Sequence, residues 1–211
     1  MHWQVALNND SFDRAGITKD CQDAVCEYIW NSFEAGASKV SVSITGIHLK
    51  EAMSLVVTDN GIGIAFDKLD KTFGAFLSSL KNNTTIQLKS QTNKGKGRFS
   101  YLSFSHSAKW HTVYRADDKL KQYTISTNSA SRSQFDTTEP TDVADITETG
   151  TSVIFSLEDS NTINLLSFKA MKQKLLEEFS WYLFLNKDKG YVLEYTGIPL
   201  NFSEYIRTDL S

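Results

Sequence analysis

Two polar side chains in the segment Asp20–Ala37, DCQDAVCEYIWNSFEAGA, have types and a spacing that suit phosphate chemistry. Glu27 and Asn31 are four residues apart, so on a helix they project from one face, one turn apart. A carboxylate can take a proton from water, and a carboxamide oxygen can ligate a hard cation. The pair therefore suits a water molecule beside a magnesium-bound phosphate.

A second stretch, VVTDNGIGI from Val56 to Ile64, combines a carboxylate with closely spaced glycines. We interpret it as a buried strand that ends at Asp59. A carboxylate held at a strand end can accept a hydrogen bond from an exocyclic amine. Gly61 and Gly63 would let the backbone approach a flat ring closely.

A third stretch, residues 81–96 (KNNTTIQLKSQTNKGK), is polar, basic and without hydrophobic periodicity. A loop of this length inside a domain is uncommon and usually functional. It leads through Gly95 and Gly97 into an apolar run, where N–H groups at the start of a helix would form a phosphate seat. Basic side chains around the glycines could neutralise phosphate further: Lys94, Lys96 and Arg98. Gly-x-Gly alone is weak support, and no Gly-Lys-Ser or Gly-Lys-Thr completes a P-loop pattern.

These stretches resemble the N box, the Asp-x-Gly-x-Gly box, the ATP lid and the second glycine box of the GHKL ATPases, which include gyrase B, the large heat-shock chaperone ATPase, histidine kinases and MutL. The run Glu27-x-x-x-Asn31-Ser-x-Glu-Ala-Gly-Ala37 looks most like the MutL and microrchidia branch. The resemblance covers roughly residues 20–157, and the order and spacing of the boxes make it specific. The commonest residue before Ala-Gly-Ala in that branch is Asp, where this chain has Glu34, a position that we interpret as structural.

The resemblance implies the Bergerat ATP-binding fold, a two-layer α/β sandwich of the α+β class with helices on one face of a mixed, mostly antiparallel sheet. It also implies magnesium-assisted ATP hydrolysis, in which Glu27 orients and deprotonates the attacking water and Asn31 ligates the metal. Asp59 would accept a hydrogen bond from the adenine amino group. The other nucleotide-binding positions that the resemblance implies are Gly61, Gly63, Lys94, Gly95, Lys96, Gly97, Arg98, Phe99 and Thr151.

The first helix that must position these side chains can be predicted from hydrophobic periodicity. Val25, Ile29 and Phe33 repeat every four residues and form a stripe that should face the core. Glu27 and Asn31 lie off this stripe, although a purely structural helix could also place polar residues there. We expect Thr18 to cap the start of the helix and Gly36 to end it.

Alternating and apolar runs predict strands at residues 39–44, 52–58, 108–114, 121–127 and 151–157, with an edge strand or arm at 3–7. Helical spacing predicts helices over 67–80 and 164–186, the second a long helix that covers the sheet and buries the aromatic residues between 179 and 184. Residues 128–146 are rich in Ser, Thr and Asp and indicate a surface loop. Residues 191–205 suggest a closing hairpin or the start of a further segment.

The composition indicates a folded chain of one domain. The sequence has 211 residues, 40% apolar and 22% charged, which favours a packed core over disorder. We expect a single ATP-binding domain with its core at residues 18–186 and a lid at about 81–98. Cys21 and Cys26 should be buried free thiols. The chain start lacks a signal-peptide pattern and no apolar run could span a bilayer, so a cytoplasmic location is expected.

Charge and family resemblance together set the expected partners. The net charge of −3, from 22 basic and 25 acidic residues, gives no general basic field for nucleic acid or an anionic membrane. We expect ATP as ligand, a second copy of the chain in a nucleotide-dependent homodimer, and a downstream domain or protein partner. Nucleic acid stays open, and no membrane is expected. Whether the chain is the N-terminal part of a longer protein also stays open.

Three functions compete at this point. The first is an ATPase acting as an ATP-driven conformational switch, weak in isolation because the family takes a γ-phosphate lysine from a following domain; Lys81, Lys94 or Lys96 could substitute. The second is a histidine-kinase-like phosphotransfer domain, which is disfavoured because only His2 precedes the first box. The third is a non-hydrolysing ATP-binding or interaction module, although Glu27 and the other key residues are present.

Overall fold

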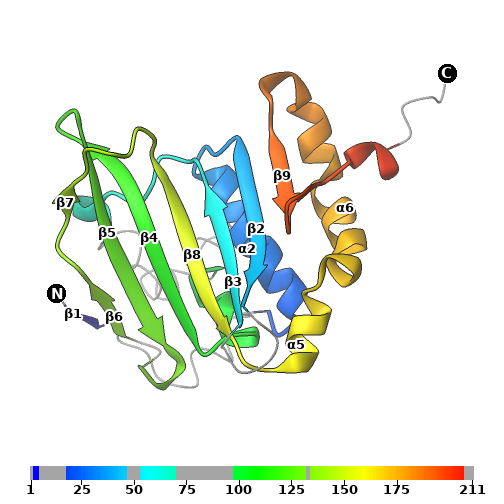
Figure 1. The fold of residues 1–211 in the computed structure, drawn as a ribbon, viewed down its shortest axis with the longest axis horizontal. Helices are drawn as coiled ribbons and strands as arrows, with labels where there is room; N and C mark the ends of the chain where they lie inside the picture. The colour runs from blue at the N-terminus through cyan, green and yellow to red at the C-terminus, as the bar shows by residue number, and fades with distance from the viewer. Residues whose placement is uncertain (1, 5–17, 47–52, 70–96, 132–133, 207–211) are drawn as a thin grey trace, which may run out of the picture.

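The computed structural model of the protein describes residues 2–4, 18–46, 53–69, 97–131 and 134–206. A ten-stranded sheet runs through these residues in the order β1-β6-β5-β4-β8-β3-β2-β9-β10, with β7 paired to β5 (Figure 1). The strands are β1 His2–Gln4, β2 Lys39–Thr45, β3 Met53–Asp59, β4 Ser107–Ala116, β5 Lys119–Asn128, β6 Gln134–Thr137, β7 Thr141–Asp142, β8 Gly150–Leu157, β9 Val192–Tyr195 and β10 Ile198–Pro199.

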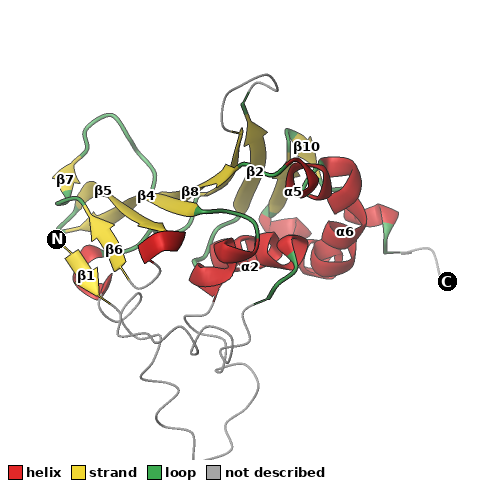
Figure 2. Cartoon of the chain, turned by 90° about the horizontal axis from the view of Figure 1, so that it is seen from below, coloured by secondary structure: helices red, strands yellow, loops and turns green. Residues whose placement is uncertain are grey.

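The expected fold class is confirmed. In the described part of the chain, only β2 and β9 pair in parallel, and the other neighbours in the sheet are antiparallel. The α-helices are α2 Cys21–Glu34, α5 Ser160–Leu165 and α6 Phe168–Leu185. Helices α2 and α6 lie on the same side of the sheet (Figure 2). The 3-10 helices are η1 Phe66–Lys68, η2 Gly97–Ser103, η3 Ser129–Ser131, η4 Lys187–Lys189 and η5 Phe202–Glu204.

Helix α2 buries the predicted stripe, because Val25, Ile29 and Phe33 all lie in the core. The prediction that Thr18 is its N-cap is wrong. Asp20 is the cap, and its carboxylate accepts hydrogen bonds from the backbone N–H groups of residues 22 and 23, which would otherwise lack partners at the helix start. Gly36 follows the last turn with a φ of +78°, which favours glycine, so the predicted end is confirmed.

The predicted strands of the sheet centre are confirmed, and their register brings the site together. Strand β3 lies between β2 and β8. Its last residue, Asp59, is paired with Val40 on one side and with Thr151 on the other. The end of β3 therefore lies beside the start of β8 and the loop that follows α2. The predicted closing hairpin is also present, as β9 and β10.

Two predicted elements differ from the structure. Residues 128–146 were expected to form a loop, but β6 and β7 lie within them, because Phe135 is buried and contacts Phe99 and Trp110. The single helix expected over 164–186 is interrupted between α5 and α6. Leu166 is fully buried there, and its carbonyl accepts a hydrogen bond from the Tyr195 hydroxyl.

Other predictions are confirmed in part. The aromatic cluster of α6 is only partly core, since Phe179 is fully buried while 56% of Trp181 is exposed. Cys21 and Cys26 are buried and free. The predicted strand near the N-terminus is described only at residues 2–4, and the helix predicted over 67–80 lies largely outside the described residues. No described helix is both long and apolar enough to cross a membrane.

Candidate functional site

A cavity of about 700 Å³ lies between α2, the end of β3, the neighbouring strands β4 and β8, and the start of η2. Its size is typical of a small-molecule site. Six residues singled out in the sequence line it, although they come from four separate segments of the chain. They are Asn31, Asp59, Gly63, Gly97, Arg98 and Thr151.

Asp59 is the most tightly held polar side chain of this cavity. Its Oδ1 accepts hydrogen bonds from the backbone N–H groups of Gly61 (2.8 Å) and Thr151 (3.2 Å), and its Oδ2 accepts one from the Ser32 hydroxyl (2.9 Å). Burial nevertheless raises the pKa of the Asp59 carboxyl above its ordinary value, against the effect of these three donors. The result is a carboxylate with a fixed orientation in the lining of the cavity.

The glycines after Asp59 are required by close packing. A Cβ on Gly61 would lie 2.8 Å from the carbonyl oxygen of Ala35. Gly63 has a φ of +71°, and a Cβ there would lie 2.1 Å from the carbonyl oxygen of Val113. The next N–H group, that of residue 64, donates to the Thr112 hydroxyl over 2.8 Å. The loop is thereby held against both α2 and β4.

Asn31 and Gly97 line the same cavity, and Glu27, which does not line it, lies beside Gly97. A Cβ on Gly97 would lie 3.0 Å from Asn31 Nδ2 and 3.3 Å from Glu27 Oε2, so both side chains face this glycine. Glu27 is half-buried and Asn31 is exposed. Burial, and after it the nearby carboxylates of Glu34 and Glu178, raises the pKa of Glu27. Such a carboxylate is a stronger base than a free one and better suited to take a proton from water.

Arg98 places a buried positive charge beside the same cavity. Its guanidinium lies 5.2 Å from the centre of the Phe99 ring, and burial lowers its pKa to about 10. The Arg98 carbonyl accepts a 2.8 Å hydrogen bond from the Tyr28 hydroxyl. Phe99 itself packs into the core against Phe135, so its side chain does not reach the cavity. The helix predicted to begin here is the short 3-10 helix η2.

Several lining residues were not found from the sequence. Lys68 and Arg115 join Arg98 to give the cavity three basic side chains, and Ile62, Ile64 and Val153 supply apolar wall. Thr112, which is buried, lies 3.2 Å from the Thr151 hydroxyl. Ser32 could have been found from the sequence, because a hydroxyl beside the buried stripe of α2 indicates a polar partner in the site. Nothing local marked Arg115, which strand β4 carries to the cavity, or Thr112, which strand pairing sets opposite Thr151.

The cavity offers little for tight binding of a metal by protein alone. Among the described residues there is no group of three or more His, Cys, Asp or Glu side chains that could hold a metal ion. Asn31 supplies one amide oxygen beside Gly97. This donor set fits Mg²⁺, which commonly takes one or two protein ligands and completes its shell with water and substrate phosphate.

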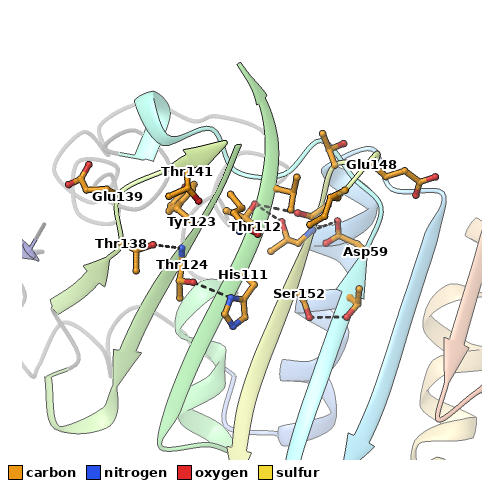
Figure 3. A pocket seen from close by; sticks show the side chains of 17 residues that line it. Asp59, His111, Thr112, Tyr123, Thr124, Thr138, Glu139, Thr141, Glu148 and Ser152 are labelled. Atoms are coloured by element: carbon orange, nitrogen blue, oxygen red, sulfur yellow. Dashed lines mark hydrogen bonds between the residues drawn. The ribbon is translucent and has the colours of Figure 1, made fainter. Parts of the chain in front are cut away.

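A second cavity, of about 600 Å³, opens over strands β4, β5 and β8 (Figure 3). Hydroxyl groups and the carboxylates of Asp59, Glu139 and Glu148 line it, and none of the described lysines or arginines does. Asp59 and Thr151 line both cavities. His111, which donates to or accepts from Thr124 over 3.1 Å, lies on its floor. The acidic lining disfavours a polyphosphate, so this cavity is the poorer candidate for a nucleotide.

Part of the predicted site lies outside the described residues. Lys94, Gly95 and Lys96, with Lys81 and most of the predicted lid, fall in residues 70–96. Their contribution stays a prediction. Of the predicted residues that remain, Asp59, Thr151, Asn31 and Gly97 line one cavity, and Glu27 lies beside Gly97 without lining it.

The chain matches the model of a known protein family. Residues 19–158, about two-thirds of the chain, match the family model described as histidine kinase-, DNA gyrase B-, and HSP90-like ATPase. This range contains every element that contributes to the cavity. The match does not distinguish the MutL and microrchidia branch from the others. No curated protein matches the chain.

Proposed function

Since the chain belongs to the histidine kinase-, DNA gyrase B- and HSP90-like ATPase family, we propose that it binds ATP with Mg²⁺ in the 700 Å³ cavity and hydrolyses it. The observation that carries the proposal is that Asp59 faces the same cavity as Asn31 and Gly97. In this proposal the Asp59 carboxylate would recognise the base and the Asn31 amide would face the phosphates within one cavity.

The base would bind at the Asp59 end. Oδ1 already accepts two hydrogen bonds and Oδ2 only one, so Oδ2 has capacity left for an amine donor. Apolar walls from Ile62, Ile64 and Val153 suit the faces of a purine. Gly63 and Thr151 would lie beside the ring, as the family resemblance implies.

The phosphates would bind at the Gly97 end. Glycine at this position keeps the space beside Glu27 and Asn31 open, because a Cβ would crowd both side chains, at 3.3 and 3.0 Å. The desolvated guanidinium of Arg98 favours an anionic ligand, and Lys68 and Arg115 add to the same field. Asn31 would be the protein ligand of Mg²⁺, which when bound neutralises charge on the phosphates.

Glu27 would act as the general base. Its carboxylate lies beside Gly97, and none of the described residues donates a hydrogen bond to it, so it is available to orient a water molecule. Its raised pKa brings it closer to the pH at which a base works best. Phosphoryl transfer of this kind depends mainly on positioning and charge stabilisation.

The ATP cycle would drive a conformational switch. A nucleotide bound beside Gly97 would contact the C-terminal end of the predicted lid, at about residues 81–98, and so could change its position. The nucleotide-dependent homodimer, a downstream partner and the cytoplasmic location stay predictions. So do the two competing functions, histidine-kinase-like phosphotransfer and ATP binding without hydrolysis.

Three measurements test the proposal together. Calorimetric titration with ATP, with and without Mg²⁺, should give one saturable site per chain that is strengthened by the metal. Phosphate release should be slow but depend on Glu27. Incubation with γ-labelled ATP should leave no acid-labile phosphoprotein, and the appearance of one would favour the phosphotransfer alternative. Absence of any saturable binding would refute the proposal.

A further inference from the structure

Tyr28 connects the helix that carries Glu27 and Asn31 to the segment that closes the phosphate end of the cavity. Its hydroxyl donates a 2.8 Å hydrogen bond to the Arg98 carbonyl, although the two residues are 70 positions apart in the chain. The side chain is almost fully buried, and its ring packs edge-on against Phe155 with 4.6 Å between centroids. Tyr28 also lines the cavity.

The neighbours of this bond place it at a sensitive point. Gly97, one residue before Arg98, lies against Glu27 and Asn31, which are one residue before and three residues after Tyr28 on α2. Both residues therefore contact α2: Gly97 lies against Glu27 and Asn31, and Arg98 accepts the hydrogen bond from Tyr28. Burial raises the pKa of the Tyr28 hydroxyl well above its ordinary value, so it remains a proton donor throughout the working pH range.

We propose that Tyr28 is a positioning residue that fixes the Gly97–Arg98 backbone for binding and hydrolysis of the polyphosphate. The inference rests on the proposed nucleotide site. With the hydroxyl in place, the Arg98 carbonyl is turned towards α2, and the planar peptide that follows is fixed with it. This sets the distance of Gly97 from Glu27 and Asn31 and the direction in which Arg98 leaves the backbone. The adenine end, built around Asp59, does not depend on this bond.

A purely structural role would give a different result, because it would lower stability without distinguishing the two ends of the ligand. The chain offers a matched control. Tyr195 is also fully buried and donates its hydroxyl to a backbone carbonyl, that of Leu166, but it does not line the cavity. Tyr28→Phe and Tyr195→Phe each remove one buried hydroxyl and keep the ring.

The experiment measures the affinities of wild type and both variants for adenosine and for ATP with Mg²⁺, together with the hydrolysis rate and Tm. For Tyr28→Phe we expect adenosine affinity within about twofold of wild type, and a loss of about three- to tenfold in ATP affinity or kcat, the size of one hydrogen bond. Tyr195→Phe should leave the ATP-to-adenosine affinity ratio and kcat unchanged at a similar loss of Tm.

The outcomes separate the two proposals. An unchanged affinity ratio and kcat in Tyr28→Phe, or an equal change in Tyr195→Phe, would overturn the positioning role while leaving the nucleotide site intact. A wild-type chain that binds neither adenosine nor ATP would refute the proposed function, and this inference with it. If Tyr28→Phe does not fold, exchange of the Tyr28 hydroxyl proton can be followed by NMR in wild type. ATP, but not adenosine, should slow that exchange, and equal effects of the two ligands would overturn the role.

Discussion

Replacement of Asp59 by asparagine should separate ligand recognition from folding. Oδ1 accepts from two backbone N–H groups, those of Gly61 and Thr151, so the oxygen of the new amide should occupy this position. Its NH₂ group then lies where Oδ2 was, beside the Ser32 hydroxyl. That hydroxyl can accept from the amide and donate instead to the carbonyl of Tyr28, 3.2 Å away. Every internal hydrogen bond of the site therefore has a replacement.

The free energy of unfolding should not fall, because burial makes the ionised carboxylate unfavourable in the folded state. The pKa of Asp59 is raised on folding, so its contribution to stability is present at low pH and is lost as the pH rises through the folded-state pKa. Asp59→Asn should thus have a Tm equal to or above that of wild type at pH 7. The difference should shrink near pH 3, where the wild-type carboxyl is protonated in both states.

ATP affinity should fall sharply in the same variant. An amide N–H that points at the adenine amino group replaces an attraction to a charged acceptor by two opposed donors. Loss of a hydrogen bond to a charged group costs about 2–3 kcal/mol, or about 30- to 150-fold in Kd. Asp145→Asn, at an exposed position outside the cavity, is the matched control and should bind ATP like wild type.

The assay is calorimetric titration with ATP and with purine riboside triphosphate, which lacks the exocyclic amine. Wild type should prefer ATP, and Asp59→Asn should lose that preference. The reasoning is refuted if Asp59→Asn retains ATP affinity within about threefold of wild type, a change below one ordinary hydrogen bond. It is also refuted if the variant loses Tm and affinity together, since Asp59 would then be a structural residue.

Three further outcomes follow from the same geometry. Glu27→Gln should keep ATP affinity within about threefold and lower phosphate release by at least about 100-fold, the usual share of a general base, and unchanged release would exclude Glu27 as the base. The hydrolysis rate should fall as the pH drops through the raised pKa of Glu27. Glu34→Gln removes a nearby negative charge, so it should shift this fall in rate to lower pH. An unshifted pH profile would contradict the contribution of Glu34 to the pKa of Glu27. Gly36→Ala should lower the free energy of unfolding by about 1–2 kcal/mol because of the positive φ at this position. Gly63→Ala should lower it more, because its Cβ would also lie 2.1 Å from the Val113 carbonyl oxygen. Equal losses in a denaturant titration would contradict the packing argument.

The sequence was most informative where one segment alone determines the structure. The buried stripe of α2, the strand that ends at Asp59 and the glycines that follow it are local patterns, and the structure has them where periodicity placed them. The start of α2 was misplaced by two residues, because Thr18 and Asp20 can both cap a helix and only the observed hydrogen bonds distinguish them.

Long-range contacts account for what the sequence did not indicate. Strand β6 has the composition of a loop and becomes a strand because Phe135 enters the core beside Phe99. The break before α6 depends on Tyr195, which lies 29 residues from Leu166. Arg115 reaches the cavity because β4, which carries it, pairs with β8, and the same pairing sets Thr112 opposite Thr151; no local pattern specifies this pairing.

The most direct test of the central claim is a crystal structure with a nonhydrolysable ATP analogue and Mg²⁺. We predict the adenine amino group within hydrogen-bonding distance of Asp59, the metal bound by Asn31, and the γ-phosphate next to Gly97 and Glu27. An analogue bound instead in the acidic cavity over β4, β5 and β8, or found with its phosphates at Asp59, would contradict the account.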